Sequence, residues 1–141
     1  MDMVTMNILD STMVSICREM GISLMKTSYS TIFNEGLDFT CALADTNGDM
    51  IAVAEFCPAQ IGGMPLLIKT CAEEFPIEEL DEGDVLIHND PYRGGLHVPE
   101  HTLFKPFLHS DKALGSLVCI GHIAEVGGMV PGGFAGEATE I

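Results

Sequence analysis

Basic residues are scarce in this sequence: six Lys and Arg stand against 21 Asp and Glu, which gives a formal net charge of −15. A chain this acidic repels phosphate backbones, so we expect no nucleic-acid partner. It also lacks the basic patch that binds anionic membranes, and no apolar run approaches the roughly 18–20 residues that span a bilayer. The N-terminus, with an early Asp2 and no basic stretch, does not resemble a signal peptide. We therefore expect a protein without membrane contact.

Cysteine pairs of the Cys-x-x-Cys type are absent, and the five cysteines are scattered. They are Cys17, Cys41, Cys57, Cys71 and Cys119. An odd, scattered set in apolar surroundings indicates reduced thiols and a cytoplasmic location. No positive, partly exposed surroundings that would activate a thiol are evident from the sequence, so we interpret all five as small core residues.

Several catalytic and nucleotide-binding motifs are also missing. None of the four Gly pairs is followed by Lys and Ser or Thr, and no Gly-x-Gly-x-x-Gly follows a strand. Nucleotide binding within this chain is therefore not expected. No Gly-x-Ser-x-Gly elbow is present, and Pro99 prevents the helical His-Glu-x-x-His arrangement of zinc proteases between His97 and His101.

The first half of the chain predicts a helix, a β-hairpin and a second helix. Apolar residues recur every three to four positions from Thr5 to about Met25, with Thr5 as the N-cap. The apolar runs within Phe39–Phe56 flank an Asn-Gly turn, which is a strong hairpin signal. The second helix is expected from Pro65, because proline suits the first helical turn, to Glu74.

The second half predicts three more strands. Val85–Ile87 is expected to be a short buried strand. Thr102–Leu108 and Ala113–Ile120 are expected to form a hairpin, with Pro106 placing the first of these strands at a sheet edge. Beyond the hairpin, Gly127–Gly136 is a Gly/Pro loop. The order of helix, hairpin, helix, strand and hairpin predicts an α+β fold that forms part of a larger mixed-sheet domain.

Histidines and carboxylates gather in two loops that follow apolar strands. Three His and two carboxylates lie between His88 and His101, in a loop fixed by Pro and paired Gly. His122 and Glu125 follow the next apolar strand. The two loops together can make a divalent metal site with nitrogen and oxygen ligands.

We favour Asp90, His97 and His122 as the metal ligands, because two His and one carboxylate leave coordination positions open for water or substrate. Glu100 and Glu125 are candidates to complete the shell or to orient a His from outside. Simpler interpretations stay open. Asp90 also suits an Asx turn before a proline, and the two remaining histidines of the first loop also suit ordinary strand and surface positions.

Several segments together resemble the hydantoinase B/oxoprolinase family. They are Lys26–Ser30, Asp38–Leu43, Gly62–Pro65, Asn89–Gly95, His97–Glu100 and Gly121–Gly132. They occur in order over essentially the whole chain, so residues 1–141 are similar to the N-terminal segment of a hydantoinase B-type domain. Members of the family are several times longer, and the abrupt end at Ile141 suggests a chain truncated relative to them. Glu100 and Glu125 stand where Asp is more usual in the family.

The resemblance implies an ATP-dependent enzyme that works with a partner. The family includes N-methylhydantoinases, 5-oxoprolinases and subunits of acetone and acetophenone carboxylases. Its nucleotide site belongs to a hydantoinase A-type subunit or domain, which implies ATP on the partner and a hetero-oligomer. In the carboxylase relatives an Asp and two His hold a metal, which is manganese in the acetone enzyme, and these match Asp90, His97 and His122. Zinc is the other metal that such ligands suit.

We therefore expect a subunit, or a fragment of one, of an ATP-dependent hydrolase that opens a cyclic amide such as a hydantoin or 5-oxoproline. The metal would activate water, with Glu125 or His101 as the nearest bases. One alternative is a ketone carboxylase subunit, in which the same metal binds an activated enol and a carboxyl donor. Another alternative is a non-catalytic interaction module, which the acidic surface and the Met-rich first helix also allow.

Overall fold

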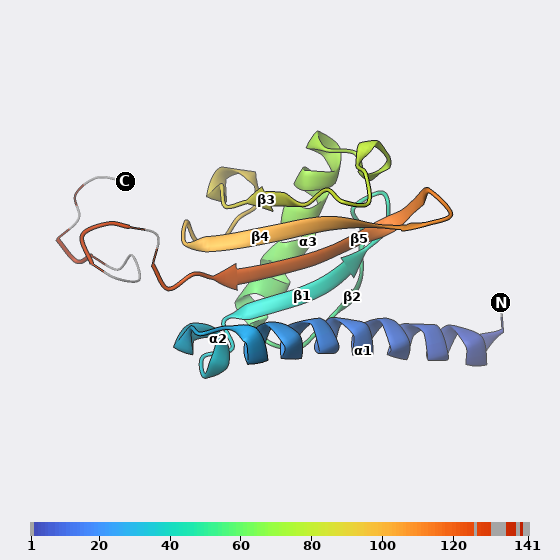
Figure 1. Cartoon of the computed structure of the whole chain (residues 1–141), viewed down its shortest axis with the longest axis horizontal. Coiled ribbons are helices and arrows are strands. Elements are labelled where there is room, and N and C mark those ends of the chain that lie inside the picture. The colour runs from blue at the N-terminus through green and yellow to red at the C-terminus, as the bar shows by residue number, and fades with distance from the viewer. Residues whose placement is uncertain (1, 126, 131–134, 138, 140–141) are drawn as a thin grey trace.

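The computed structural model describes residues 2–125, 127–130, 135–137 and 139. A five-stranded sheet lies between two longer helices, α1 (Met3–Thr27) and α3 (Pro58–Glu74) (Figure 1). The strands are β1 (Phe39–Ala44), β2 (Met50–Val53), β3 (Leu86–His88), β4 (Glu100–His109) and β5 (Lys112–His122). Their order across the sheet is β2-β1-β5-β4-β3, and these pairings are all antiparallel. The predicted α+β fold is confirmed, whereas a larger mixed sheet stays a prediction.

Three short helical segments connect these elements. They are α2 (Thr31–Asn34), η1 (Ile77–Glu79) and η2 (Pro91–Arg93). No helix among the described residues is long and apolar enough to cross a membrane. The predicted Gly/Pro loop falls partly outside the described residues, because 131–134 are not among them.

Helix α1 begins and ends slightly beyond its predicted bounds. Its N-cap is Asp2, whose carboxylate accepts from the backbone N–H of Thr5 at 2.9 Å, so Thr5 is not the cap that the sequence suggested. Gly21 lies where the helix meets the sheet. A Cβ at Gly21 would stand 2.1 Å from the ring of Phe56 and 2.9 Å from that of Phe39. The glycine is therefore needed for the close approach of helix and sheet.

The start of helix α3 was predicted wrongly. The helix begins at Pro58, which occupies the favoured first-turn position, and Pro65 lies inside it. Pro65 has no N–H to donate to the carbonyl four residues earlier, yet the helix continues to Glu74. The neighbouring Gly63 has a packing reason, because Leu96 lies 2.7 Å from where its Cβ would stand. This tertiary contact holds the helix together across Pro65, although a proline in the sequence is a local signal of a helix boundary.

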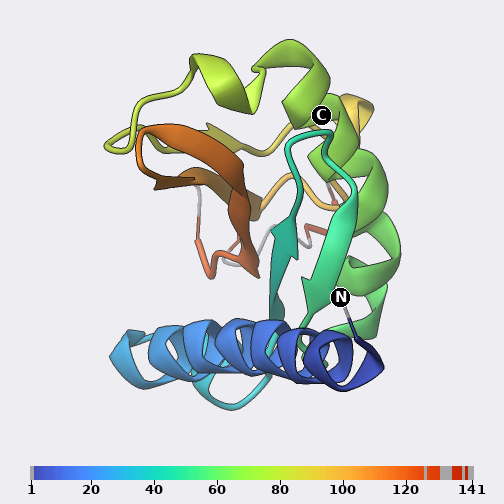
Figure 2. The same cartoon turned by 90° about the vertical axis from the view of Figure 1, so that its right-hand side faces the viewer.

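The two helices cover different faces of the sheet, as Figure 2 shows with α1 below the strands and α3 beside them. Ala42, Phe104 and Val118 point to the face on which α3 packs and form the larger core with it. Leu43 points to the other face and packs with Cys17 of α1. Because side chains alternate along a strand, β1, β2, β4 and β5 each contribute to both cores.

Strands β3 and β4 differ from expectation in exposure. β3 is an edge strand and is not buried, since Ile87 is 66% exposed. β4 lies inside the sheet, between β5 and β3, so the edge position predicted from Pro106 is wrong for the strand as a whole. The last β3–β4 pair, Leu86 with Phe104, ends before Pro106. The proline, which cannot donate a ladder hydrogen bond, therefore lies where β4 has only one neighbour.

Replacing Gly21 with Ala should destabilise the protein by about 1–3 kcal/mol, because the added methyl overlaps the Phe56 ring in a packed core. Gly62→Ala is the matched control. Gly62 lies within α3, and no atom of the described residues is within 4 Å of where its Cβ would stand, so alanine should be neutral or stabilise by up to about 1 kcal/mol. Urea unfolding of both variants measures the difference. Equal effects would contradict the close packing of α1.

Candidate functional site

Three polar residues form a row at one end of the sheet. Glu100 is the first residue of β4, His122 is the last of β5, and the two are directly opposite one another. On the other side of β5, the backbone N–H of His122 donates to the carbonyl of Asp38 at 3.0 Å. Antiparallel pairing thus brings together residues that are up to 84 positions apart in sequence. Glu100 and His122 point to the face covered by α3, since they lie an even number of residues from Phe104 and Val118, which pack on that face.

Glu100 is a buried carboxylate, with 2% of its surface exposed. Its Oε1 lies 3.0 Å from Nδ1 of His97 and 3.0 Å from Nε2 of Gln60. Its Oε2 accepts the backbone N–H of His97 at 3.1 Å. A carboxylate loses its hydration when it is buried, and these three contacts replace it. An ionised carboxylate can only accept, so in that state of Glu100 the shared proton would be on Nδ1 of His97.

Gln60, in the first turn of α3, links the two carboxylates of the site. Its Nε2 donates to Asp38 Oδ1 at 2.9 Å as well as to Glu100. Because both acceptors are carboxylates, the amide nitrogen must face them, and this fixes the direction of the Gln60 oxygen. That Oε1 is buried and has no hydrogen-bond partner among the described residues. Buried acceptors are normally paired, so this unpaired oxygen is unusual for a protein interior.

His97 and His122 lie edge to face, with ring centroids 5.9 Å apart. Both line a cavity of about 540 Å³ at the end of the sheet. Its walls are Ile32, Gly36, Leu37, Asp38, Phe56, Cys57, Pro58, His97 and His122. Nδ1 of His122 is buried without a partner among the described residues, which makes it a second polar atom in need of a ligand.

The turn into β1 positions Asp38. Leu37 has a φ of 51°, a left-handed conformation that is costly for a side chain of its size. The backbone N–H of Asp38 then donates to the carbonyl of Ile32 at 3.1 Å, which holds the turn against α2. Backbone strain of this kind, about 1–3 kcal/mol, is concentrated at functional sites in proteins. Here the strained turn places the Asp38 carboxylate within hydrogen-bond distance of Gln60.

The structure brings together only part of the predicted ligand set. His97 and His122 share the cavity, whereas Asp90 does not line it. The Asp90 carboxylate instead accepts the N–H of Tyr92 at 2.9 Å and lies 3.5 Å from Nε of Arg93, as the N-cap of η2. This is the Asx-type turn that the sequence also allowed. The role of Asp90 as a ligand stays a prediction.

The two predicted bases lie elsewhere. His101 follows Glu100 on β4, so its side chain points to the opposite face of the sheet, where it lines another cavity with Leu103. Glu125 is exposed, and its Oε1 accepts the N–H of Gly127 at 2.6 Å. Neither lines the cavity of His97 and His122. Their catalytic roles also stay predictions.

The residues of the cavity fit a divalent cation in their chemistry. Two imidazoles and the Glu100 carboxylate are nitrogen and oxygen donors of the type that zinc and manganese take. Nδ1 of His122 is also buried and has no partner among the described residues, so a bound ion or molecule could supply one. Within the described part of the chain, however, no group of three or more His, Cys, Asp or Glu side chains is arranged so that it could hold a metal ion. A bound cation would therefore require these side chains to turn.

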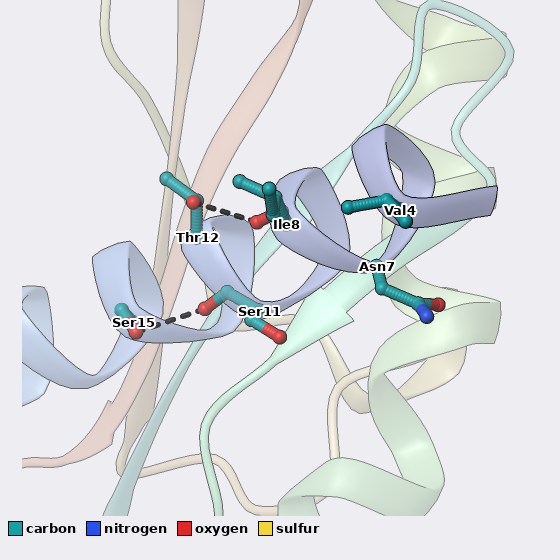
Figure 3. Close-up of a pocket in the computed structure, with 6 residues that line it drawn as sticks. All are labelled: Val4, Asn7, Ile8, Ser11, Thr12 and Ser15. Atoms are coloured by element: carbon teal, nitrogen blue, oxygen red, sulfur yellow. Dashed lines mark hydrogen bonds between the residues drawn. The ribbon is translucent and has the colours of Figure 1, made fainter. Parts of the chain in front are cut away.

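A second hollow lies beside the N-terminal half of α1 and differs in character (Figure 3). It is lined by Val4, Asn7, Ile8, Ser11, Thr12 and Ser15. The hydroxyls of Thr12 and Ser15 donate to carbonyls of their own helix, at 2.7 and 2.8 Å. Because this lining includes no titratable side chain, we assign the candidate site to the cavity of His97 and His122.

Sequence reasoning missed two residues of this site. Asp38 stood in a family-like segment but carried no predicted role, because its proximity to His122 depends on the pairing of β1 with β5. Gln60 is a neutral polar side chain among the apolar residues of the first half of α3. The available signal was a polar residue on the buried stripe of α3. This signal could be recognised only if the helix was known to begin at Pro58, because the predicted start at Pro65 left Gln60 outside the helix.

Comparison with known proteins agrees with the fold and the motifs. The model of the hydantoinase B/oxoprolinase family matches residues 2–141. A 5-oxoprolinase from Arabidopsis thaliana is 37% identical over 93% of this chain and 10% of its own length. The beta subunit of the Pseudomonas jessenii caprolactamase is 34% identical over 99% of this chain and 24% of its own.

Two solved structures share the fold. The crystal structure of the ATP-dependent caprolactamase from Pseudomonas jessenii matches 95% of this chain and 23% of its own, with a TM-score of 0.84 and 34% identity. A nucleotide-free acetone carboxylase matches 86% of this chain and 16% of its own, with a TM-score of 0.73 and 20% identity, a likeness in fold. The chain thus spans about a quarter or less of the length of the curated relatives that it matches.

Replacing Gln60 with Leu should lower the free energy of unfolding by about 1–3 kcal/mol, because two buried or half-buried carboxylates lose their shared donor. Thr70→Val, on the exposed side of the same helix, is the control and should change stability by less than about 0.5 kcal/mol. Chemical denaturation measures both. A Gln60→Leu variant as stable as the wild type would show that the amide does not hold the site together.

Proposed function

Because the chain belongs to the hydantoinase B/oxoprolinase family, we propose that it is part of an ATP-dependent hydrolase of cyclic amides. The observation that carries the proposal is the cavity of His97 and His122, with Glu100 buried behind it. Cyclic amides are stable toward water, so their hydrolysis needs a positioned nucleophile and an activated carbonyl. The cavity supplies the first requirement.

His97 is the residue that we assign to proton transfer. Its hydrogen bond with the buried Glu100 carboxylate keeps the proton on Nδ1, and this leaves the lone pair on Nε2. In a metal-free site, an imidazole held in this way can accept a proton from water at Nε2, while the carboxylate stabilises the imidazolium that forms. With a metal bound, the same Nε2 lone pair would be the metal's donor, and His97 would not act as the base. Glu100 acts through His97 in this scheme, and Gln60 holds Glu100.

For the metal we propose His97 and His122 as the protein donors, with Glu100 behind them to hold His97, in place of the Asp90 ligand of the sequence analysis. The support is that both imidazoles line one cavity and that Glu100 contacts His97, whereas Asp90 caps η2. A divalent ion at this position would supply acidity to a coordinated water and charge to balance a developing oxyanion. The walls contributed by Leu37, Phe56 and Pro58 would limit competing water.

Activation of the carbonyl requires a partner in this proposal. The sequence has no phosphate-binding loop, and the caprolactamase that it resembles is described as ATP-dependent and has a subunit named beta. We infer that a hydantoinase A-type subunit or domain binds ATP and phosphorylates the carbonyl oxygen of the substrate. The chain would then work in a hetero-oligomer, with water attacking the activated carbon at the cavity described here.

Metal content should depend on the cavity residues. In the full-length protein, His97→Ala, His122→Ala and Glu100→Gln should each weaken binding of manganese or zinc by about 10–100-fold or more, because each removes a donor or its support. Titration of the metal-free protein, with elemental analysis after dialysis, measures the change.

Asp90→Asn is the matched control for these variants, since it also removes one carboxylate from the same loop region. We expect it to retain the metal and to lose some stability of the η2 cap. Loss of metal in Asp90→Asn with retention in Glu100→Gln would contradict our assignment and support the ligand set expected from the sequence.

A substrate panel tests the reaction itself. The panel contains hydantoins, 5-oxoproline and lactams, assayed with the partner subunit and ATP. ADP should be released only when one of these cyclic amides is present, and the ring of that amide should open. His97→Ala should lower kcat by about 100–10,000-fold, the range of lost general acid–base catalysis. ATP use that requires a ketone and bicarbonate, with no amide opened, would overturn the hydrolase and favour a carboxylase.

A further inference from the structure

Two cysteines of different strands face one another in the sheet. Cys41 of β1 is directly opposite Cys119 of β5, and their sulfur atoms are 3.6 Å apart. All five cysteines are present as free thiols. A sulfur–sulfur contact of this kind lies between two residues that are 78 positions apart in sequence. The scattered spacing of the cysteines gave no sign of it.

The backbone at this pair suits a covalent bond between the sulfurs. The carbonyl of Cys41 accepts the N–H of Ala54 at 3.0 Å, so the backbone of Cys41 is bonded toward β2 and away from β5. Cys41 and Cys119 therefore form a non-hydrogen-bonded cross-strand pair, in which the Cα atoms approach to about 4.5 Å. This separation is within the range of about 4.4–6.8 Å that disulfides require.

Solvent and small molecules can reach only one of the two thiols. Cys41 is 1% exposed under α1, whereas Cys119 is half-buried and lines a cavity of about 280 Å³. His101 and Leu103 of β4 line the same cavity. A small oxidant can reach Cys119 from this side but cannot reach Cys41 directly, so the two thiols have different roles.

The hydrogen bond between the thiols also makes them unequal. Donation from Cys41 to the sulfur of Cys119 lowers the pKa of Cys119 from its ordinary value. The same hydrogen bond, together with burial, raises the pKa of Cys41. Cys119 is thus the sulfur with more thiolate character, and thiolates are the reactive form of cysteine.

We propose that Cys41 and Cys119 form a reversible oxidation site that reacts with hydrogen peroxide and closes to a cross-strand disulfide. The Cys119 thiolate attacks the peroxide, so that a sulfur–oxygen bond forms, the oxygen–oxygen bond breaks and hydroxide leaves. Cys41 then attacks the Cys119 sulfenic acid, forming the sulfur–sulfur bond and releasing the hydroxyl group. The protons of the two thiols convert both hydroxides to water, so two thiols are oxidised and one peroxide is reduced.

The test uses the full-length protein, treated with hydrogen peroxide, alkylated and digested with trypsin without reduction. Cleavage after Lys26, Lys69 and Lys112 leaves Cys41 in peptide 27–69 and Cys119 in the peptide that begins at Ala113. We expect these two peptides to be linked, with loss of two hydrogen atoms, and to separate after dithiothreitol.

Alanine variants assign the link. It should disappear in Cys41→Ala and in Cys119→Ala. It should persist in Cys57→Ala, which removes the other thiol of peptide 27–69, and in Cys71→Ala, whose buried thiol lies in the α3 core with a pKa raised to about 11 by burial. A link that survives in Cys41→Ala, or that is lost in Cys57→Ala, overturns the proposal. So does oxidation of Cys119 to the sulfinic acid without a link.

A labelling-rate measurement on the wild-type protein tests the proposal even if the alanine variants fail to fold. In the wild-type protein, iodoacetamide should label Cys119 several-fold faster than Cys71, and peroxide should block labelling of Cys41 and Cys119 together. If peroxide blocks Cys119 while Cys41 stays available to alkylation in the unfolded, unreduced chain, the two sulfurs are not joined and the proposal fails.

Discussion

The register of β5 with its two neighbours is the constraint on which the site depends. His122 ends this strand, with Glu100 opposite on β4 and the Asp38 carbonyl opposite on the β1 side. Side chains alternate with a period of two, so a slip of one residue in either ladder would turn one partner to the other face of the sheet. The packed side chains on both faces resist such a slip, because it would expose every core residue of the strand. The apolar cores thus specify the chemistry at the end of the sheet.

The cavity and the buried residues behind it combine satisfied and unsatisfied polar atoms. The Glu100 carboxylate is saturated by donors, whereas the Gln60 oxygen and Nδ1 of His122 are left without partners among the described residues. The first arrangement favours rigidity, since a buried and fully bonded carboxylate cannot easily move. The second favours binding, since a ligand recovers hydrogen bonds that the protein alone does not make. In a chain of net charge −15, an anionic, phosphorylated substrate would also need a cation or imidazolium nearby.

The sequence predicted the element types and half of the site, and the misses have physical reasons. Periodicity and the Asn-Gly turn identified the helices and hairpins, because these signals are local. His97 and His122 were favoured because they lie in loops that follow apolar strands, and the structure places both at one cavity. Asp90 was favoured for its place after a strand and for its match to the family, and its role as a ligand stays a prediction, since the structure shows its carboxylate in a local turn. Gln60 required knowledge of how α3 packs on the sheet, which no local pattern contains. Pro65 and its neighbouring glycines were misinterpreted for the same reason.

The directions of the strands separate the chemistry from the hairpin turns. β1 and β4 run away from the site, and β5 returns to it, so the turns at 45–49 and 110–111 lie at the far end of the sheet (Figure 1). Eleven residues of β5 at about 3.4 Å each place the Ser110–Asp111 turn roughly 35 Å from His122. A fluorophore or peptide epitope inserted at that turn would report on the protein from a distance, without entering the space where a substrate must fit.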